Sequence, residues 1–535
     1  MFRGRNIQYE GGDRVRGLGA GGIGAIHLLA QRTGLAAKID ANLLVLQVHQ
    51  PYHESDHVLH IAYNILCGGK TLEDLEQLRH DEVYQDAMGA WVVPDPTTAG
   101  DFTRRCRDSD NEALMAAIDR VRVKVWQQQP DAFFDEAIVD ADGTLAPTRG
   151  ACKEGMEISH DGAWSYHPLV VSLANTRESL YPVNRNGNRP SHEGAAERPD
   201  QAIALCRQAG FRQILLRGDR DFSSTRHLDR WDAAQVRFVF GFDAIPKLVK
   251  IATELAGSAW KRLQRPAKYK VKTQARDRRA NIKERVVVER EFQNIRLTSE
   301  DVAEFRYQPG ACRRPYRVVA VRKNLSVEKG ERVLFDDLRY FYYITNDETA
   351  AAAELVLLAN DRCNQENLIA QLKLGVHAMR MPVSTRASNG AHMVMASLAW
   401  TLKAWFALLL PEVGRWGGAV RGGEAAGAAD GVPHVPAGVH RDAVSDRSRG
   451  PTHRVSAAGV ESVAASLPAR RRGAAAAVAL LEPTVPGGVG RKLGATTEVV
   501  MNGKRSSDQL DTGVDNRPLQ GRNGDPCVRV TGWWR

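Results

Sequence analysis

Three acidic residues stand out because each lies at the end of a regular element or on one of its faces. Asp142 follows a short apolar run in VDADGT, and Asp219 follows another in RGDRDF. Glu366 lies in DRCNQENLIAQLK, which has helical periodicity. Acids at the carboxyl ends of strands in an α/β sheet lie where such folds place their active sites. We therefore predict that the three carboxylates form one catalytic, metal-binding site.

Carboxylates suit the cleavage of phosphodiester bonds, because hard divalent cations prefer oxygen ligands. Two Mg²⁺ ions about 4 Å apart stabilise both the attacking and the leaving oxygen. We predict Mg²⁺ as the cofactor of a two-metal site, with Mn²⁺ as a substitute. Asp140 and Asp221 neighbour the first two acids and are alternative ligands. An Asp after a strand is also a common turn or cap residue, so the prediction depends on the three acids together.

Basic residues accompany these acids. Arg362 lies four residues before Glu366 and Lys373 seven after it, so a continuous helix would place all three on one face. Arg holds phosphates through bidentate contacts and Lys as a point charge. The run 261–290 carries twelve Lys or Arg against three acids. It predicts a segment that follows a nucleic-acid backbone, or else a flexible basic loop. Its candidate contacts are Lys268, Lys270 and Lys272.

The composition narrows the class of protein. A chain of 535 residues is too long for one core and suggests three or four units at roughly 150 residues each. Its net charge of +10 favours a polyanionic partner. Seven cysteines without a CxxC pair argue against a disulfide framework or zinc ribbon and fit a reducing cytoplasm. The N-terminus has no apolar run typical of a signal peptide.

One apolar stretch, Met393–Leu410, is about as long as a membrane span. Lys403 lies inside it, and a charge at the centre of a bilayer is costly. We therefore predict a buried core helix and no membrane contact.

The predicted secondary structure changes along the chain, from helices in the first part to alternating strands and helices around the acids. Residues 1–125 read as helical, with a break at Gly34 that is compatible with a helix-turn-helix, and DNA binding by this region is what the family resemblance of the chain implies. Arg104 and Arg105 are candidate phosphate contacts there, although a solvated helix face is the alternative. Residues 130–245 alternate apolar runs with an amphipathic helix, which predicts an α/β layer with some parallel pairing. The runs are 137–140, 167–174, 213–216 and 237–242, and the helix is 199–210.

The second half continues this alternation. Residues 246–345 predict a basic, β-rich insertion with strands at 284–292, 316–321 and 340–344. Residues 346–410 predict helices at 347–377 and 388–410 that complete the core. The remaining stretch, 411–535, contains no Ile, Phe or Tyr and predicts a disordered, low-order tail. A shift of one nucleotide permits an amphipathic, aromatic translation of residues 431–463, so a frameshift near codon 411 is our second hypothesis.

The motifs around the acids resemble a known family. VDADGT, RGDRDF and DRCNQENLIAQLK are similar to the three motifs of DDE transposases with an RNase H-like core and a β-rich insertion before the catalytic glutamate. YHPLVVSLANT, NRNGNRPSHEGAA, GGIGAIHLLA, PYHESDHVL and DPTTAGDFTRR resemble the insertion-sequence family numbered thirteen-eighty. The similarity covers about residues 1–412. It implies that Asp142, Asp219 and Glu366 are the metal-binding triad.

The same resemblance implies further roles. Arg362 and Lys373 match a signature of Tyr, Arg, Glu and Lys at fixed spacing, but Ala359 stands in place of the tyrosine. This departure puts a hairpin intermediate at the transposon ends in doubt. The implied activity is cut-and-paste DNA transposition, in which water nicks the DNA and the freed 3′-hydroxyl attacks the opposite strand or target DNA. A homodimer on paired terminal repeats, in the bacterial nucleoid, is also implied.

Other interpretations stay open. An inactive DNA-binding remnant with a frameshifted C-terminus would bind but not cut, and a host nuclease would cut without joining. Gly17, Gly19 and Gly22 form GxGxxG, with Asp40 about twenty residues on, as in a dinucleotide-binding fingerprint. The preceding DRVR is a poor buried strand, so these glycines predict a turn into a helix instead.

Overall fold

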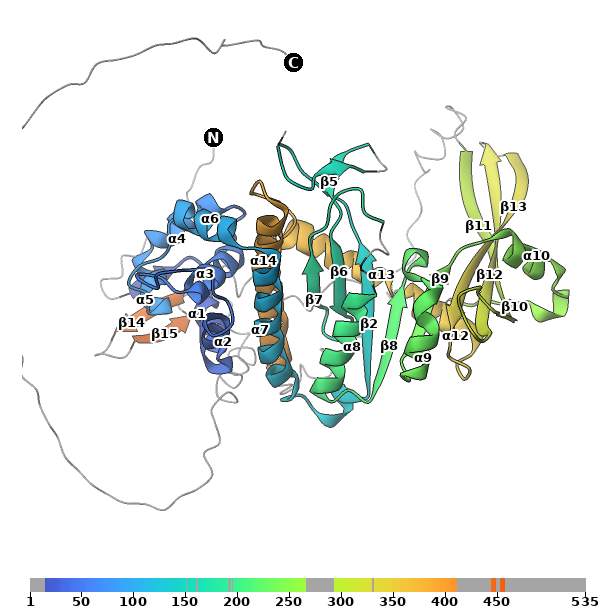
Figure 1. Cartoon of the computed structure of the whole chain (residues 1–535), viewed down its shortest axis with the longest axis horizontal. Coiled ribbons are helices and arrows are strands. Elements are labelled where there is room, and N and C mark those ends of the chain that lie inside the picture. Colours follow the sequence, from blue (N-terminus) through green and yellow to red (C-terminus); the bar gives the residue numbers. More distant parts are fainter. Residues whose placement is uncertain are drawn as a thin grey trace, which may run out of the picture. The chain divides into compact units, whose positions relative to one another are not determined.

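The computed structural model describes residues 15–150, 152–159, 162–190, 194, 196–265, 293–329, 332–410, 444–448 and 453–457. This part of the chain combines a helical N-terminal region with a nine-stranded mixed sheet (Figure 1). The predicted α/β class is therefore confirmed.

The N-terminal region is helical, as predicted. Gly22 (φ +90°) precedes the first helix and Gly34 (φ +73°) separates the first two. Glycine adopts such positive φ values without steric cost, so the glycines form turns. Strand β1 pairs antiparallel with β14, so no parallel βαβ unit supports a dinucleotide site there. The elements are β1 (Val15–Leu18), α1 (Ile23–Thr33), α2 (Leu35–Asp40), α3 (Glu54–Leu66), η1 (Leu72–Asp74), α4 (Leu75–Arg79), α5 (Glu82–Met88), α6 (Pro96–Arg105) and α7 (Asp108–Trp126).

Five strands form the half of the large sheet that carries the first two acids. Their order is β7-β6-β2-β8-β9, in which β2, β8 and β9 are parallel and β6 and β7 antiparallel to their neighbours. Helix α8 (Glu197–Ala209) precedes β8 and ends at Gly210, as predicted. The strands are β2 (Glu136–Gly143), β6 (Leu169–Leu173), β7 (Glu178–Val183), β8 (Gln213–Gly218) and β9 (Arg237–Phe242). Four of them coincide with predicted runs, and β7 was not predicted.

Four further strands extend the same sheet beyond β9. Strand β13 (Arg332–Thr345) pairs antiparallel with β9, followed by β12 (Tyr316–Lys329), β11 (Gln293–Tyr307) and β10 (Lys261–Arg262). The predicted strands at 316–321 and 340–344 are the ends of longer strands. The predicted strand at 284–292 and Lys268, Lys270 and Lys272 lie outside the described residues. Strand β11 was missed because its polar residues conceal an apolar alternation.

Short helices connect these strands, and a long helix covers the sheet. Helices α9 (Leu228–Ala233) and α10 (Pro246–Glu254) flank β9 along the chain. Then come α12 (Ala352–Asn360), α13 (Cys363–Ala370), a π-helical turn η6 (Gln371–Gly375) and α14 (Arg386–Leu408). Helix α14 packs against α3, α7 and β7, and most of its residues are buried, as predicted for a core helix. Among the described helices, none has the length and apolar character needed to cross a bilayer.

A buried ionic network joins α7, β7 and α14. The carboxylate of Glu178, fully buried, accepts hydrogen bonds from Arg122 Nε at 2.9 Å and from the indoles of Trp126 at 2.8 Å and Trp405 at 2.7 Å. A charge buried this deeply is tolerated only when it is paired and hydrogen-bonded. The network therefore ties the helical region to the edge of the sheet.

Two small sheets complete the described structure. One contains β3 (Ala146–Pro147), β5 (Trp164–Tyr166) and β4 (Glu157–Ile158), and the other contains β1, β14 (Val444–Ser448) and β15 (His453–Ala457). The last two strands fall inside the predicted low-order tail, so that prediction is wrong for these ten residues. The rest of 411–535 lies outside the described residues.

Candidate active site

The register of β2 and β8 brings the first two acids together. Asp140 lies opposite Arg217, and Ala141 opposite Gly218, in the parallel pair. Because side chains alternate along strands, Asp142 and Asp219 follow on the same face, one row further on. Asp142 itself lies within β2 rather than after it, because pairing with β6 continues to Gly143.

The loop after β8 fixes Asp219. Its side chain accepts the N–H of Asp221 at 2.9 Å and so caps the short helix η3 (Arg220–Phe222). Gly241 of β9 lies directly against this loop: a Cβ there would come within 2.8 Å of Arg220 N and 3.2 Å of Asp219 C. A glycine at 241 therefore allows the backbone of Asp219 to lie close over the sheet.

Glu366 reaches the same region from α13. Arg362, at the N-cap of this helix, donates to Asp142 Oδ2 at 3.1 Å, and its other amino group lies 3.9 Å from Glu366 Oε1. The guanidinium therefore stands between the two acids. The Arg362 side chain is 17% exposed and that of Glu366 is 63% exposed, so Glu366 lies at the open side of the site.

The pKa values of the two aspartates are raised, because their carboxylates are partly buried and lie close together. Burial raises the pKa of Asp142 to about 6; Arg362 opposes this shift, and the charge of Asp219 adds to it. Burial likewise raises the pKa of Asp219, again against Arg362. The triad thus has more negative charge than Arg362 alone compensates. A further positive charge would stabilise it.

Lys373 lies beyond Glu366 in the π-helical turn η6. Burial lowers its pKa, while Asp142 raises it, which places the ammonium within the electrostatic range of the triad. A π turn widens the helix, so Lys373 reaches this region by a different geometry from the continuous α-helix that we predicted. A partly desolvated ammonium beside the acids is suited to hold a phosphate.

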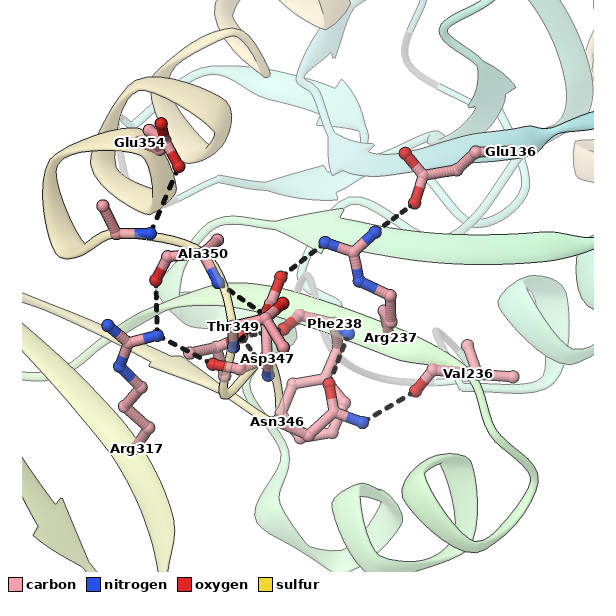
Figure 2. Close-up of polar contacts among 12 residues, drawn as sticks. Glu136, Val236, Arg237, Phe238, Arg317, Asn346, Asp347, Thr349, Ala350 and Glu354 are labelled. Atoms are coloured by element: carbon pink, nitrogen blue, oxygen red, sulfur yellow. Dashed lines mark hydrogen bonds and ion pairs between the residues drawn. The ribbon is translucent and has the colours of Figure 1, made fainter.

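A polar network fixes the start of α12, which leads to α13 (Figure 2). The carboxylate of Asp347 accepts the N–H groups of Thr349 and Ala350 and a bond from Arg237, which also binds Glu136 of β2. These bonds lower the pKa of Asp347, although burial opposes them. Arg317 of β12 donates to the carbonyls of Asp347 and Ala350. The turn that brings the chain back from β13 is therefore anchored to three strands.

Two buried residues behind the acids were not predicted as site residues. Arg217 forms a bidentate pair with Asp140, with Nε–Oδ1 at 2.7 Å and Nη2–Oδ2 at 2.8 Å. Gln365, beside Glu366, accepts a bond from the Ser172 hydroxyl and donates to the carbonyl of Val170 at 3.0 Å. A charged residue inside the apolar run of β8 was the available signal for Arg217. For Gln365 the sequence offers none.

The remaining candidates lie elsewhere. Asp140 is buried against Arg217, and Asp221 is half-exposed, with its Oδ1 3.9 Å from Arg220 Nε. Arg104 and Arg105 are exposed at the end of α6, where Arg104 is paired with Asp101. Ala359 is half-buried in α12, packed against the small apolar cluster between α12 and the sheet.

The donor atoms of the three acids are of the kind that binds a divalent metal ion. Asp142, Asp219 and Glu366 supply only oxygen donors, which hard cations such as Mg²⁺ prefer. Within the described residues no three His, Cys, Asp or Glu side chains already enclose a metal position. The Arg362 guanidinium stands between Asp142 and Glu366, 3.1 Å from the first carboxylate and 3.9 Å from the second. The three carboxylates therefore fit Mg²⁺ by the chemistry of their donor atoms.

Two comparisons with known proteins, one of sequence and one of structure, gave a match. The sequence profile of the family described as transposase DDE domain group 1 matches residues 8–417. A cryo-EM structure of a piggyBac transposase synaptic complex with hairpin DNA aligns at 11% identity and a TM-score of 0.32. This alignment covers 78% of the present chain and 82% of the other. No curated protein sequence matches the chain.

Proposed function

The chain belongs to the transposase DDE domain group 1 family, and from this we propose that it catalyses metal-dependent cleavage and strand transfer of insertion-sequence DNA. The observation that carries the proposal is that Asp142 and Asp219 directly follow the last register pair of the parallel strands β2 and β8, Ala141 and Gly218, while Glu366 is linked to Asp142 through Arg362. The proposed outcome is cut-and-paste transposition.

Asp142, Asp219 and Glu366 would hold the metal, with Mg²⁺ as the proposed ion and Mn²⁺ as a substitute. Bound metal supplies charge stabilisation at the attacking and leaving oxygens of the phosphodiester. Water first attacks the phosphorus, the P–O3′ bond breaks, and a 3′-hydroxyl and a 5′-phosphate remain. That hydroxyl then attacks the phosphorus of a second phosphodiester. The new O3′–P bond forms as the P–O3′ bond of the attacked phosphodiester breaks and leaves a free 3′-hydroxyl, so the number of phosphodiester bonds is unchanged and no external energy source is needed. Arg362 and Lys373 are placed to hold the non-bridging oxygens of the phosphate.

The strand order supports an RNase H-like core. In the order β7-β6-β2-β8-β9, strands β7, β6 and β2 are each antiparallel to the next, and β8 and β9 are parallel to β2. Asp142 lies in β2, and Asp219 directly follows β8. Strands β10–β13 extend this sheet between β9 and α12 along the chain, which is where a β-rich insertion is proposed. We propose that the helical region 1–125 recognises terminal repeats, that residues 261–290 follow the DNA backbone, and that a homodimer binds the paired ends.

Cleavage of labelled terminal DNA from the element that encodes the chain tests the proposal. Asp142→Asn, Asp219→Asn and Glu366→Gln are expected to bind this DNA in a gel shift but to cut it about a thousandfold more slowly, about 4 kcal/mol in the barrier. Glu348→Gln, in an exposed pair with Arg306, is the matched control and should cut normally. Joined products distinguish a transposase from a nuclease. Undiminished cutting by the three variants would refute the triad.

A second candidate function, an inactive DNA-binding remnant, is favoured by one observation. The family profile ends at residue 417, and no Ile, Phe or Tyr occurs in the sequence after Phe406. If a frameshift near codon 411 removed the native C-terminus, the chain would bind terminal DNA without cutting it. Restoring the frame should then restore cleavage, whereas equal cleavage by both chains would exclude the remnant.

A further inference from the structure

Strands β2 and β8 and helix α12, which precedes the helix of Glu366, meet at a single buried arginine. Arg217 lies in β8, two residues before Asp219, and its partner Asp140 lies in β2, two residues before Asp142. Its third bond runs from Nη1 to the carbonyl of Leu358 at 3.0 Å, in the last turn of α12. This turn leads directly to Arg362 and Glu366. Both side chains of the ion pair are almost fully buried, at 4% and 2% exposure.

The hydrogen bond from Arg217 satisfies a backbone carbonyl, that of Leu358, in the last turn of α12. The last carbonyls of a helix lack partners within the helix. The N–H of Arg362, which would pair with Leu358 in a continuing helix, donates to the carbonyl of Ala359 instead. The guanidinium of Arg217 donates to the Leu358 carbonyl instead of this N–H and adds a positive charge at the negative end of the helix dipole. The position of the Arg362 turn is therefore coupled to β8.

We infer that Arg217 is a positioning residue that sets the spacing of Asp142, Asp219 and Glu366 through its bonds to β2 and α12. This inference rests on the proposed function, since it concerns the same site. A buried ion pair is weak evidence for stability, because apolar residues of similar volume often replace it without loss. Its directional bonds are what apolar residues cannot reproduce. Lysine cannot reproduce them either, because it lacks the planar fork of arginine.

Gln365 connects helix α13 to strand β6, on the side of β2 opposite to Arg217. Its amide contacts Val170 and Ser172 of β6, which lie opposite Asp142 and Asp140 in the register. Helix α13 is thus fixed to β6 at the residue next to Glu366, while Arg217 fixes the end of α12. Together these bonds connect α12 and α13 to both neighbours of β2.

The experiment measures Mn²⁺ affinity of the full chain by electron paramagnetic resonance, together with its thermal midpoint and cleavage rate. Arg217→Met alone leaves Asp140 buried and unpaired, so the decisive variant is the double replacement Arg217→Met/Asp140→Leu. We expect it to keep a thermal midpoint near that of the wild type but to bind Mn²⁺ about 10–100-fold more weakly. Arg217→Lys should also bind Mn²⁺ more weakly than the wild type.

Arg122→Met is the matched control, because this arginine is equally buried but lies in the α7–β7 network. It should lower the thermal midpoint while leaving Mn²⁺ affinity unchanged. Wild-type affinity in the double variant would overturn the inference and leave the proposed function intact. A wild-type chain whose Mn²⁺ binding does not depend on Asp142 would overturn the proposed function and the inference with it.

Discussion

Gly241→Ala should displace the loop that carries Asp219. The new Cβ would lie 2.8 Å from Arg220 N, whereas ordinary contacts begin at 3.4 Å, so one of the two must move by about 0.6 Å. The opposing atoms belong to the backbone, so no side-chain rotation relieves the clash. Overpacking of this kind typically costs about 1–3 kcal/mol of folding free energy. A shift on the order of 1 Å at an active site costs about 100-fold in rate, so we expect about a 10-fold slower cleavage.

The assay compares initial rates of DNA cleavage in Mg²⁺ and thermal midpoints for Gly241→Ala and Gly257→Ala. The second variant is the control, because a Cβ at Gly257 would meet no atom within 4 Å. It should match the wild type in both measurements. Cleavage by Gly241→Ala within twofold of the control would refute the argument that the backbone of Asp219 depends on this close approach.

Three further predictions concern stability and DNA binding. Glu178→Gln removes one of the two carboxylates that pair with the buried Arg122, the other being Asp119, and should lower the free energy of unfolding by about 2 kcal/mol in urea titrations, against less than about 1 for the exposed Glu348→Gln. His392 is buried, and burial lowers its pKa to about 4. As the pH falls, the imidazole of residue 392 is therefore protonated at a higher pH in the unfolded chain than in the folded chain. Stability should therefore fall as pH drops from about 6.5 to 4, and His392→Gln should flatten that slope by up to about 1.4 kcal/mol per pH unit. Lys373→Gln should weaken DNA binding in anisotropy titrations and reduce the salt slope by about one, and an unchanged slope would exclude a phosphate contact.

The helical and extended segments could be predicted from sequence wherever the signal was local. Strand β9 and helix α8 were found within a few residues of their bounds, because apolar alternation and a C-terminal glycine mark such elements directly. Strand β7 escaped because Pro182 and two polar residues interrupt its pattern, and its burial under α14 is a tertiary property. Strand β14 pairs with β1, more than 400 residues away, and β15 pairs with β14, and local composition cannot reveal the first of these pairings.

The sequence by itself determined which acids are candidates, because each acid lies in a short local motif: an apolar run that predicts a strand, or a pattern that predicts a helix. Only the tertiary structure decided how they are arranged. Asp140 and Arg217 are 77 residues apart, and their pairing depends on the register between β2 and β8. A shift of one residue would turn every side chain of a strand to the other face, so burial of the sheet fixes the register. That register makes Asp140 the partner of Arg217 and leaves Asp142 and Asp219 together in the next row.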